Sequence, residues 1–160
     1  MPDRPMPFGL PWGCTTMPVF TGVSHVDLTV RDADRSAAWY ERVLGMTSLG
    51  HLPDLATPGV AARVITMMNP VTGMTFGMVQ HDSGEDREFS EFRVGLDHLS
   101  LAVASHAELE EWVAHLDACG VDHSSIAEMP YGSVVVFRDP DNIQLELFVV
   151  AVNFQHPGFG

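Results

Sequence analysis

Hydrophobic and polar residues alternate in two short segments that share one motif. The segment around His25 reads GVSHVDLTV, and the segment around His98 reads GLDHLSLAV. In both, apolar side chains occupy every second position after the histidine, which is typical of a strand with one buried face. The two histidines are 73 residues apart (98 − 25), and the same offset superposes Trp39 on Trp112. We interpret this as one internal duplication.

A helix signal and three strand-like runs follow each segment. The first helix is predicted over 33–44, with Asp32 as its N-cap and Gly45 as its end. The second begins with a capping-box pattern at Ser105 and ends at Gly120. The strand-like runs lie near 46–52, 60–68, 74–81, 123–128, 133–138 and 143–149. We therefore predict an α+β protein in which two tandem βαβββ modules form a cupped, barrel-like mixed sheet with helices outside.

The length of 160 residues suits one domain. Prolines dominate the N-terminal segment and exclude both a helix and the apolar core of a signal peptide, and a charged stretch separates the two modules. The predicted organisation is a Pro-rich arm (1–20), a single domain (21–150) made of module one (21–81), a charged linker (82–93) and module two (94–150), and a C-terminal tail (151–160).

Charge narrows the range of partners. The chain has 8 Lys+Arg against 21 Asp+Glu, a formal net charge of −13. Such a surface repels phosphate, which argues against nucleic acids and anionic membranes as partners. Two cysteines make no disulfide framework, and no run of 18 uninterrupted apolar residues is present. We expect a soluble protein in a reducing, cytoplasmic compartment.

Three side chains with metal-binding chemistry share one predicted face of the sheet. In the last strand-like run Leu145 and Leu147 form the apolar face, so Glu146 points the other way, to the side of His25 and His98. Two imidazoles and one carboxylate form a known ligand set for divalent metals. The alternatives are solvent-exposed or hydrogen-bonded histidines and a glutamate on the solvent side of an edge strand. By the same parity His81 is a reserve ligand.

These motifs resemble the vicinal oxygen chelate superfamily, which includes glyoxalases, bleomycin-resistance proteins and extradiol dioxygenases. The matching sequences are those around His25 and His98, WY…VLG at 39–45 and FRDPDNIQLELF at 137–148. The resemblance implies metal ligands from the first and last strands of each module, here His25, His98 and Glu146. The fourth position falls on Gly77, which has no ligating side chain.

The resemblance also implies a reaction class. Glyoxalase I and methylmalonyl-CoA epimerase would need a Glu or Gln at residue 77, so three ligands favour a dioxygenase-like oxidation with Fe(II) of a substrate that binds through vicinal oxygens. Glu146 and Tyr131 are the predicted catalytic residues, with His123 as a possible substitute for Tyr131. A fosfomycin-modifying activity is disfavoured because 148–154 carries no charge. Non-redox isomerase, lyase or epimerase chemistry with Zn, Ni or Mn, and sequestration of a drug or metabolite, remain alternatives. A homodimer is expected.

Overall fold

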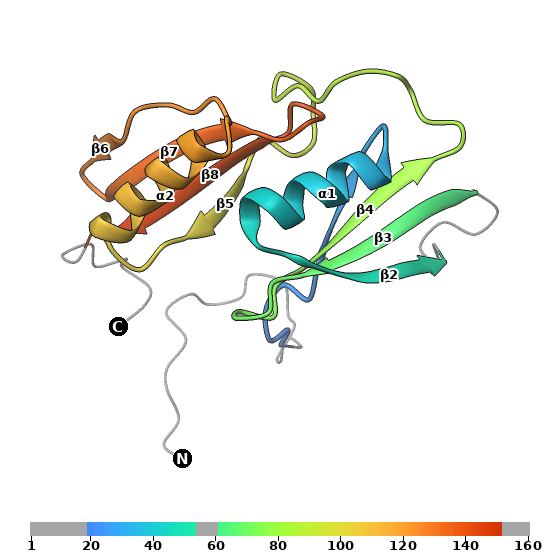
Figure 1. Cartoon of the computed structure of the whole chain (residues 1–160), viewed down its shortest axis with the longest axis horizontal. Helices are drawn as coiled ribbons and strands as arrows, with labels where there is room; N and C mark the ends of the chain where they lie inside the picture. The colour runs from blue at the N-terminus through green and yellow to red at the C-terminus, as the bar shows by residue number, and fades with distance from the viewer. Residues whose placement is uncertain (1–18, 54–60, 152–160) are drawn as a thin grey trace, which may run out of the picture.

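The computed structural model describes residues 19–53 and 61–151, so nearly all of the predicted arm and tail lies outside the described residues. Each module folds as one strand, one helix and three further strands (Figure 1). Module one contains β1 (Val26–Thr29), α1 (Ala33–Leu44), β2 (Thr47–Pro53), β3 (Ala62–Met68) and β4 (Thr75–His81). Module two contains β5 (Leu99–Ala102), α2 (His106–Ala118), β6 (Ala127–Met129), β7 (Gly132–Arg138) and β8 (Gln144–Val150).

The strands form two four-stranded mixed sheets, in the orders β1-β4-β3-β2 and β5-β8-β7-β6. In each sheet the first strand runs parallel to the last strand of its module, and the other pairs are antiparallel. The predicted α+β class and the two βαβββ modules are confirmed, and the sheets are cupped without closing into barrels. Within the described residues, β1 and β5 each pair on one side only.

The predicted N-cap residues and glycines lie at the ends of both helices. The side chain of Asp32 accepts a hydrogen bond from the N–H group three residues on, at 3.0 Å, and Ser105 does the same for α2 at 3.2 Å. Gly45 adopts a left-handed conformation with φ 61°, as does Gly120 with φ 65°; α1 ends one residue before Gly45, and α2 ends two residues before Gly120. Local capping chemistry therefore fixes where both helices begin and end.

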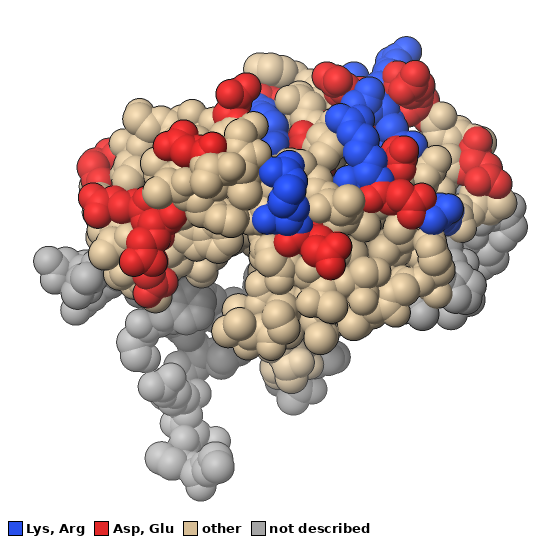
Figure 2. Space-filling view, in the orientation of Figure 1, with Lys and Arg blue, Asp and Glu red and all other residues tan. Residues whose placement is uncertain are grey.

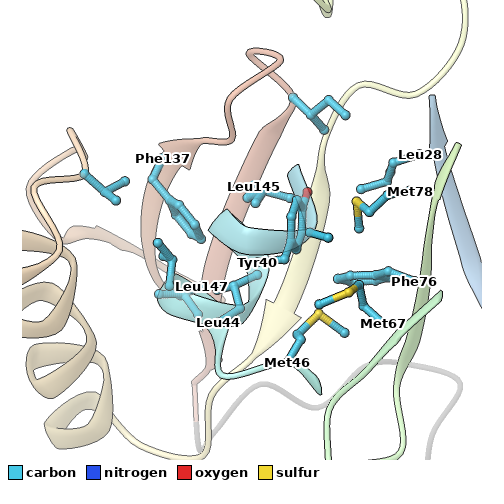
Figure 3. Packing of buried hydrophobic residues seen from close by; sticks show 14 of the residues in the cluster. Leu28, Tyr40, Leu44, Met46, Met67, Phe76, Met78, Phe137, Leu145 and Leu147 are labelled. Carbon is cyan, nitrogen blue, oxygen red and sulfur yellow. The ribbon is translucent and has the colours of Figure 1, made fainter. Parts of the chain in front are cut away.

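Helix α1 connects the two modules through the core. Figure 3 shows Tyr40 and Leu44 of this helix between the β8 side chain Leu147 and the β4 side chain Phe76. The rings of Tyr40 and Phe76 meet edge to face, with centroids 5.8 Å apart. At the other end of the side chain, the Tyr40 hydroxyl donates to Asp139 Oδ2 of the β7–β8 turn at 3.2 Å. One apolar cluster thus spans both modules.

Strand β6 is shorter than the run predicted at 123–128. Ser124 pairs with Val136 through both its backbone and its side chain: its N–H donates to the Val136 carbonyl at 2.8 Å, and its Oγ accepts the Val136 N–H at 3.0 Å. Because the hydroxyl replaces a backbone carbonyl as acceptor, the regular ladder begins only at Ala127. His123 makes an isolated bridge to Phe137.

Candidate metal centre

Module two presents a histidine beside a carboxylate. Leu145 and Leu147 are buried against the helices, so Glu146 projects from the opposite face of β8, as the alternation predicted, with 15% of its side chain exposed. Its Oε1 lies 3.6 Å from Nε2 of His98, which immediately precedes β5. His98 Nδ1 donates to Oδ1 of Asp97 at 2.6 Å. This bond orients the ring so that Nε2 faces Glu146.

Module one repeats this arrangement with a different carboxylate. His25 Nδ1 lies 2.9 Å from Oγ of Ser24, the residue before it, and Nε2 lies 3.9 Å from Oδ2 of Asp27. The side chains of His25 and Asp27 are 58% and 44% exposed, respectively. In both modules the residue preceding the histidine thus contacts Nδ1 and leaves Nε2 beside a carboxylate, which is the usual way that metal-binding imidazoles are oriented.

The strand register explains why the two carboxylates come from different strands. Asp27 pairs with Gly77 across β1 and β4, and Ser100 pairs with Glu146 across β5 and β8. Asp27 and Ser100 each lie two residues after their histidine, so Gly77 occupies the place of Glu146, as the sequence alignment of the modules proposed. A Cβ atom at residue 77 would collide with Oδ1 of Asp27 and lie 2.9 Å from its Cγ.

The donor set fits a divalent metal ion, because it combines oriented imidazoles with carboxylates. The fit is incomplete within one chain. The described parts of the chain contain no group of three or more His, Cys, Asp or Glu side chains placed to hold a metal ion. The structure brings His98 and Glu146 together, whereas His25 sits with Asp27. Each module therefore offers half of a site.

Tyr131 lies in the turn between β6 and β7, with 44% of the residue exposed. Its ring stacks on Phe148 with centroids 6.1 Å apart. Phe148 follows Glu146 by two residues on β8 and so shares its face. This position brings the Tyr131 ring to the side of the sheet that carries the module-two carboxylate.

His81, the reserve ligand, and His123, the possible substitute for Tyr131, lie away from the two histidine–carboxylate pairs. His81 ends β4 four residues beyond Gly77, about 13 Å along the strand. Its Nδ1 is buried without a hydrogen-bond partner among the described residues. His123 donates toward α2 with Nε2 3.2 Å from Asp117, and Nδ1 contacts the Ser124 carbonyl at 2.7 Å. That carbonyl is the main cause of its raised pKa. Both of its nitrogens are thus engaged away from Glu146.

Asp27, Ser24 and Asp97 were not predicted as site residues from the sequence. The alternation that placed His25 on the inner face also placed Asp27 there, so parity could have identified it. Ser24 and Asp97 each precede one of the two histidines in the sequence. A polar residue at this position in both modules was the one signal that could have identified them.

A cavity of about 630 Å³ lies between the two modules. It is lined mainly by apolar side chains, and His25 and Ser100 also border it. Residues of β1 and β5 therefore line this cavity, and the two strands do not pack edge to edge there.

Basic side chains on the face in Figure 2 lie next to acidic ones. Arg31 Nε donates to Asp141 Oδ1 at 2.6 Å, and Arg138 Nη2 donates to Glu91 Oε1 at 2.8 Å. Their charge is thus offset locally. No helix in the described residues is both long enough and apolar enough to cross a membrane.

Comparison with known proteins gives a family match. The model of the Glyoxalase/Bleomycin resistance protein/Dioxygenase superfamily matches residues 22–147. A glyoxylase/bleomycin resistance protein/dioxygenase domain from Frankia sp. EAN1pec is 34% identical, with a TM-score of 0.73 over 86% of this chain and 98% of that one. A search of curated protein sequences found no significant match.

More distant structures share the fold. The genomically encoded fosfomycin resistance protein FosX from Listeria monocytogenes, in complex with Mn(II) and sulfate, is 20% identical with a TM-score of 0.57 over 84% of this chain and 96% of its own. A glyoxalase family protein from Enterococcus faecalis is 20% identical with a TM-score of 0.61 over 81% and 98%. At this level of identity the likeness concerns the fold alone.

Proposed function

The chain belongs to the glyoxalase/bleomycin resistance protein/dioxygenase superfamily, and on that premise we propose that it is a divalent-metal-dependent enzyme. Its substrate is a small molecule that chelates the metal through two vicinal oxygen atoms. One observation carries the proposal: each module holds a histidine by Nδ1 and presents its Nε2 beside a carboxylate, at 3.6 Å in module two and 3.9 Å in module one.

His25, His98 and Glu146 would hold the ion. A bound divalent metal supplies Lewis acidity that polarises the substrate oxygens. Asp97 and Ser24 fix the imidazole rings, so that Nε2 is available as the donor atom without reorganisation. Tyr131 lies at an exposed position on the Glu146 side of the sheet and is the proposed proton donor or acceptor.

Two reaction classes are compatible with this set of residues. Fe(II)-dependent, dioxygenase-like oxidation is the class favoured by the sequence, and isomerase, lyase or epimerase chemistry with Zn, Ni or Mn is the second. Activity that requires O2 identifies the first class, and activity that persists under anaerobic conditions identifies the second. FosX, which has the same fold, was crystallised with Mn(II).

We propose further that a complete site forms between two copies of the chain. Three observations support this: the described residues of one chain do not bring His25, His98 and Glu146 into one metal-binding group, β1 and β5 pair on one side only within the same residues, and a cavity lies between the modules. A twofold-symmetric dimer would place module one of one copy against module two of the other, giving two equal sites.

Metal analysis tests the enzyme proposal. Protein purified without added metal should contain about one equivalent of a divalent ion per chain, and His98→Ala and Glu146→Ala should each lose it. A wild-type protein that neither contains nor takes up metal would contradict the proposal and leave sequestration of a metabolite as the function.

Mixing inactive variants tests the shared site. Neither His25→Ala nor Glu146→Ala should retain tight Mn(II) binding alone. After dissociation and reassociation of an equal mixture, half of the dimers are mixed, and each carries one intact site out of two. About a quarter of the wild-type sites should therefore return, from this symmetry alone. A mixture of His98→Ala with Glu146→Ala is the matched control, because both changes fall in module two and no intact site can form. Absence of recovery in the first mixture would place the site within one chain.

A further inference from the structure

We infer that Asp27 is the metal-binding carboxylate of module one and stands in for the missing side chain at residue 77. This inference rests on the proposed function, because it concerns the same site. It adds a fourth protein ligand to His25, His98 and Glu146, and it assigns that ligand to β1 and not to the last strand of the module.

Residue types are exchanged across the paired strands of the two modules. In module two the β5 residue two positions after the histidine is Ser100, and its partner on β8 is Glu146. In module one the corresponding β1 residue is Asp27, and its partner on β4 is Gly77. Each pair contains one carboxylate and one small residue. The carboxylate lies on the first strand of module one but on the last strand of module two. The carboxylate is retained at this level of the sheet in both modules.

Asp27 and a side chain at residue 77 would compete for the same space. Oδ1 of Asp27 lies so close to Gly77 that a Cβ atom there would overlap it. Even an alanine at residue 77 would displace the Asp27 carboxylate, and a glutamate would compete with it for the same space. The absence of a side chain at Gly77 is therefore what allows Asp27 to lie over β4.

The distance between Asp27 and His25 is compatible with binding of one ion by both side chains. Asp27 Oδ2 is 3.9 Å from Nε2 of His25, comparable to the 3.6 Å between Glu146 Oε1 and Nε2 of His98. Ligand atoms that each lie about 2.0–2.2 Å from one ion can be separated by as much as about 4 Å. Both histidine–carboxylate pairs meet this condition without a change of rotamer. Two carboxylates would also balance the charge of a divalent ion.

A swap of residue types tests the inference. The variants are Asp27→Ser, which copies the residue found at Ser100, and the double variant Asp27→Ser/Gly77→Glu, which copies the whole module-two pattern. Asp86→Ser, in the exposed linker, is the matched control. The full chain is titrated with Mn(II) alone, free Mn(II) is followed by its EPR signal, and thermal unfolding is recorded with and without the ion.

We expect Asp27→Ser to weaken Mn(II) binding by about tenfold or more, the range seen when groups supporting a metal are removed. The double variant should recover affinity to within about threefold of wild type, and Asp86→Ser should not change it. Stabilisation by Mn(II) should fall and recover in parallel. This recovery separates metal binding from a structural role, because a structural Asp27 would not be replaced by a glutamate on another strand.

Three results would overturn the inference. If Asp27→Ser binds Mn(II) like wild type while His98→Ala does not, Asp27 is not a ligand and the proposed function stands. If Asp27→Ser loses affinity but the double variant recovers none, the carboxylate does not act from the position we assign. If the wild-type protein binds no Mn(II), Zn(II) or Fe(II), the proposed function and this inference both fall.

Discussion

Asp139 is a buried carboxylate whose replacement by asparagine should change the dependence of stability on pH. Only 6% of the residue is exposed. Its Oδ1 accepts the N–H groups of Asp141 and Ile143 at 2.9 and 2.7 Å, and its Oδ2 accepts the hydroxyl of Tyr40 at 3.2 Å. Asn keeps an oxygen for both backbone donors and an amide group for the tyrosine, while it removes the ionisation.

Burial is the main cause that raises the pKa of Asp139 from 3.8 to about 6, against the hydrogen bonds, which lower it. The folded state therefore prefers the protonated acid, and this contribution to stability is complete below pH 3.8 and is lost as the pH rises through about 6. A difference of about 2 in pKa corresponds to about 3 kcal/mol in total. With these two pKa values, the contribution of Asp139 to the free energy of unfolding falls by about 1.4 kcal/mol between pH 5 and pH 8.

Urea unfolding of wild type and Asp139→Asn at a fixed protein concentration, at pH 5, 6, 7 and 8, measures this effect. Other groups titrate alike in the two proteins, so the difference between their free energies of unfolding isolates Asp139. The free energy of unfolding of Asp139→Asn, relative to that of wild type, should rise by about 1.4 kcal/mol from pH 5 to pH 8. Asp122→Asn, an exposed position, should show no such trend. A difference between wild type and Asp139→Asn that stays constant over this range would refute the reasoning.

Three further changes have defined outcomes. Gly132→Ala should destabilise the fold by about 1–3 kcal/mol in urea unfolding, because a Cβ atom there would lie 2.6 Å from Cζ of Phe148; an unchanged midpoint would contradict this. Ser105→Ala should cost about 1 kcal/mol in the same assay, because the N–H of Glu108 loses its acceptor. Tyr131→Phe should lower kcat and leave Mn(II) affinity unchanged, as measured by steady-state kinetics and titration; equal kcat would remove Tyr131 from the proposed chemistry.

Local sequence signals predicted most of the fold. Helix α1 covers the predicted range 33–44, and the alternation around Glu146 identified the buried leucines of β8. These features depend on capping chemistry and on a period of two, which are encoded by near neighbours along the chain. Strand β6 is shorter than predicted because the Ser124 hydroxyl replaces a backbone carbonyl as hydrogen-bond acceptor. The pattern of apolar and polar residues cannot predict such a replacement.

The candidate site was predictable only in part, because it depends on which residues face each other across strands. His98 was identified by its position in a duplicated unit, and Glu146 by the alternation of apolar residues in its strand. The role of Asp27 required the register between β1 and β4, since only this register places its carboxylate over Gly77. The separation of His25 from Glu146 within one chain depends on how the modules pack around α1, and α1 contacts side chains from both sheets. A single-sequence pattern contains no information on that arrangement.

The number of protein ligands links the site to the class of reaction. Two histidines and one carboxylate would leave a divalent ion with more open positions than four protein ligands would, so they would admit O2 beside a substrate that binds through vicinal oxygens. A fourth ligand from Asp27 would leave room for such a substrate alone. Three protein ligands would therefore suit the Fe(II)-dependent oxidation predicted from the sequence, and four would suit isomerase, lyase or epimerase chemistry. The Mn(II) titration of Asp27→Ser therefore bears on the reaction class before any substrate is known: weakened binding would favour non-redox catalysis, and unchanged binding would favour the oxidative reaction.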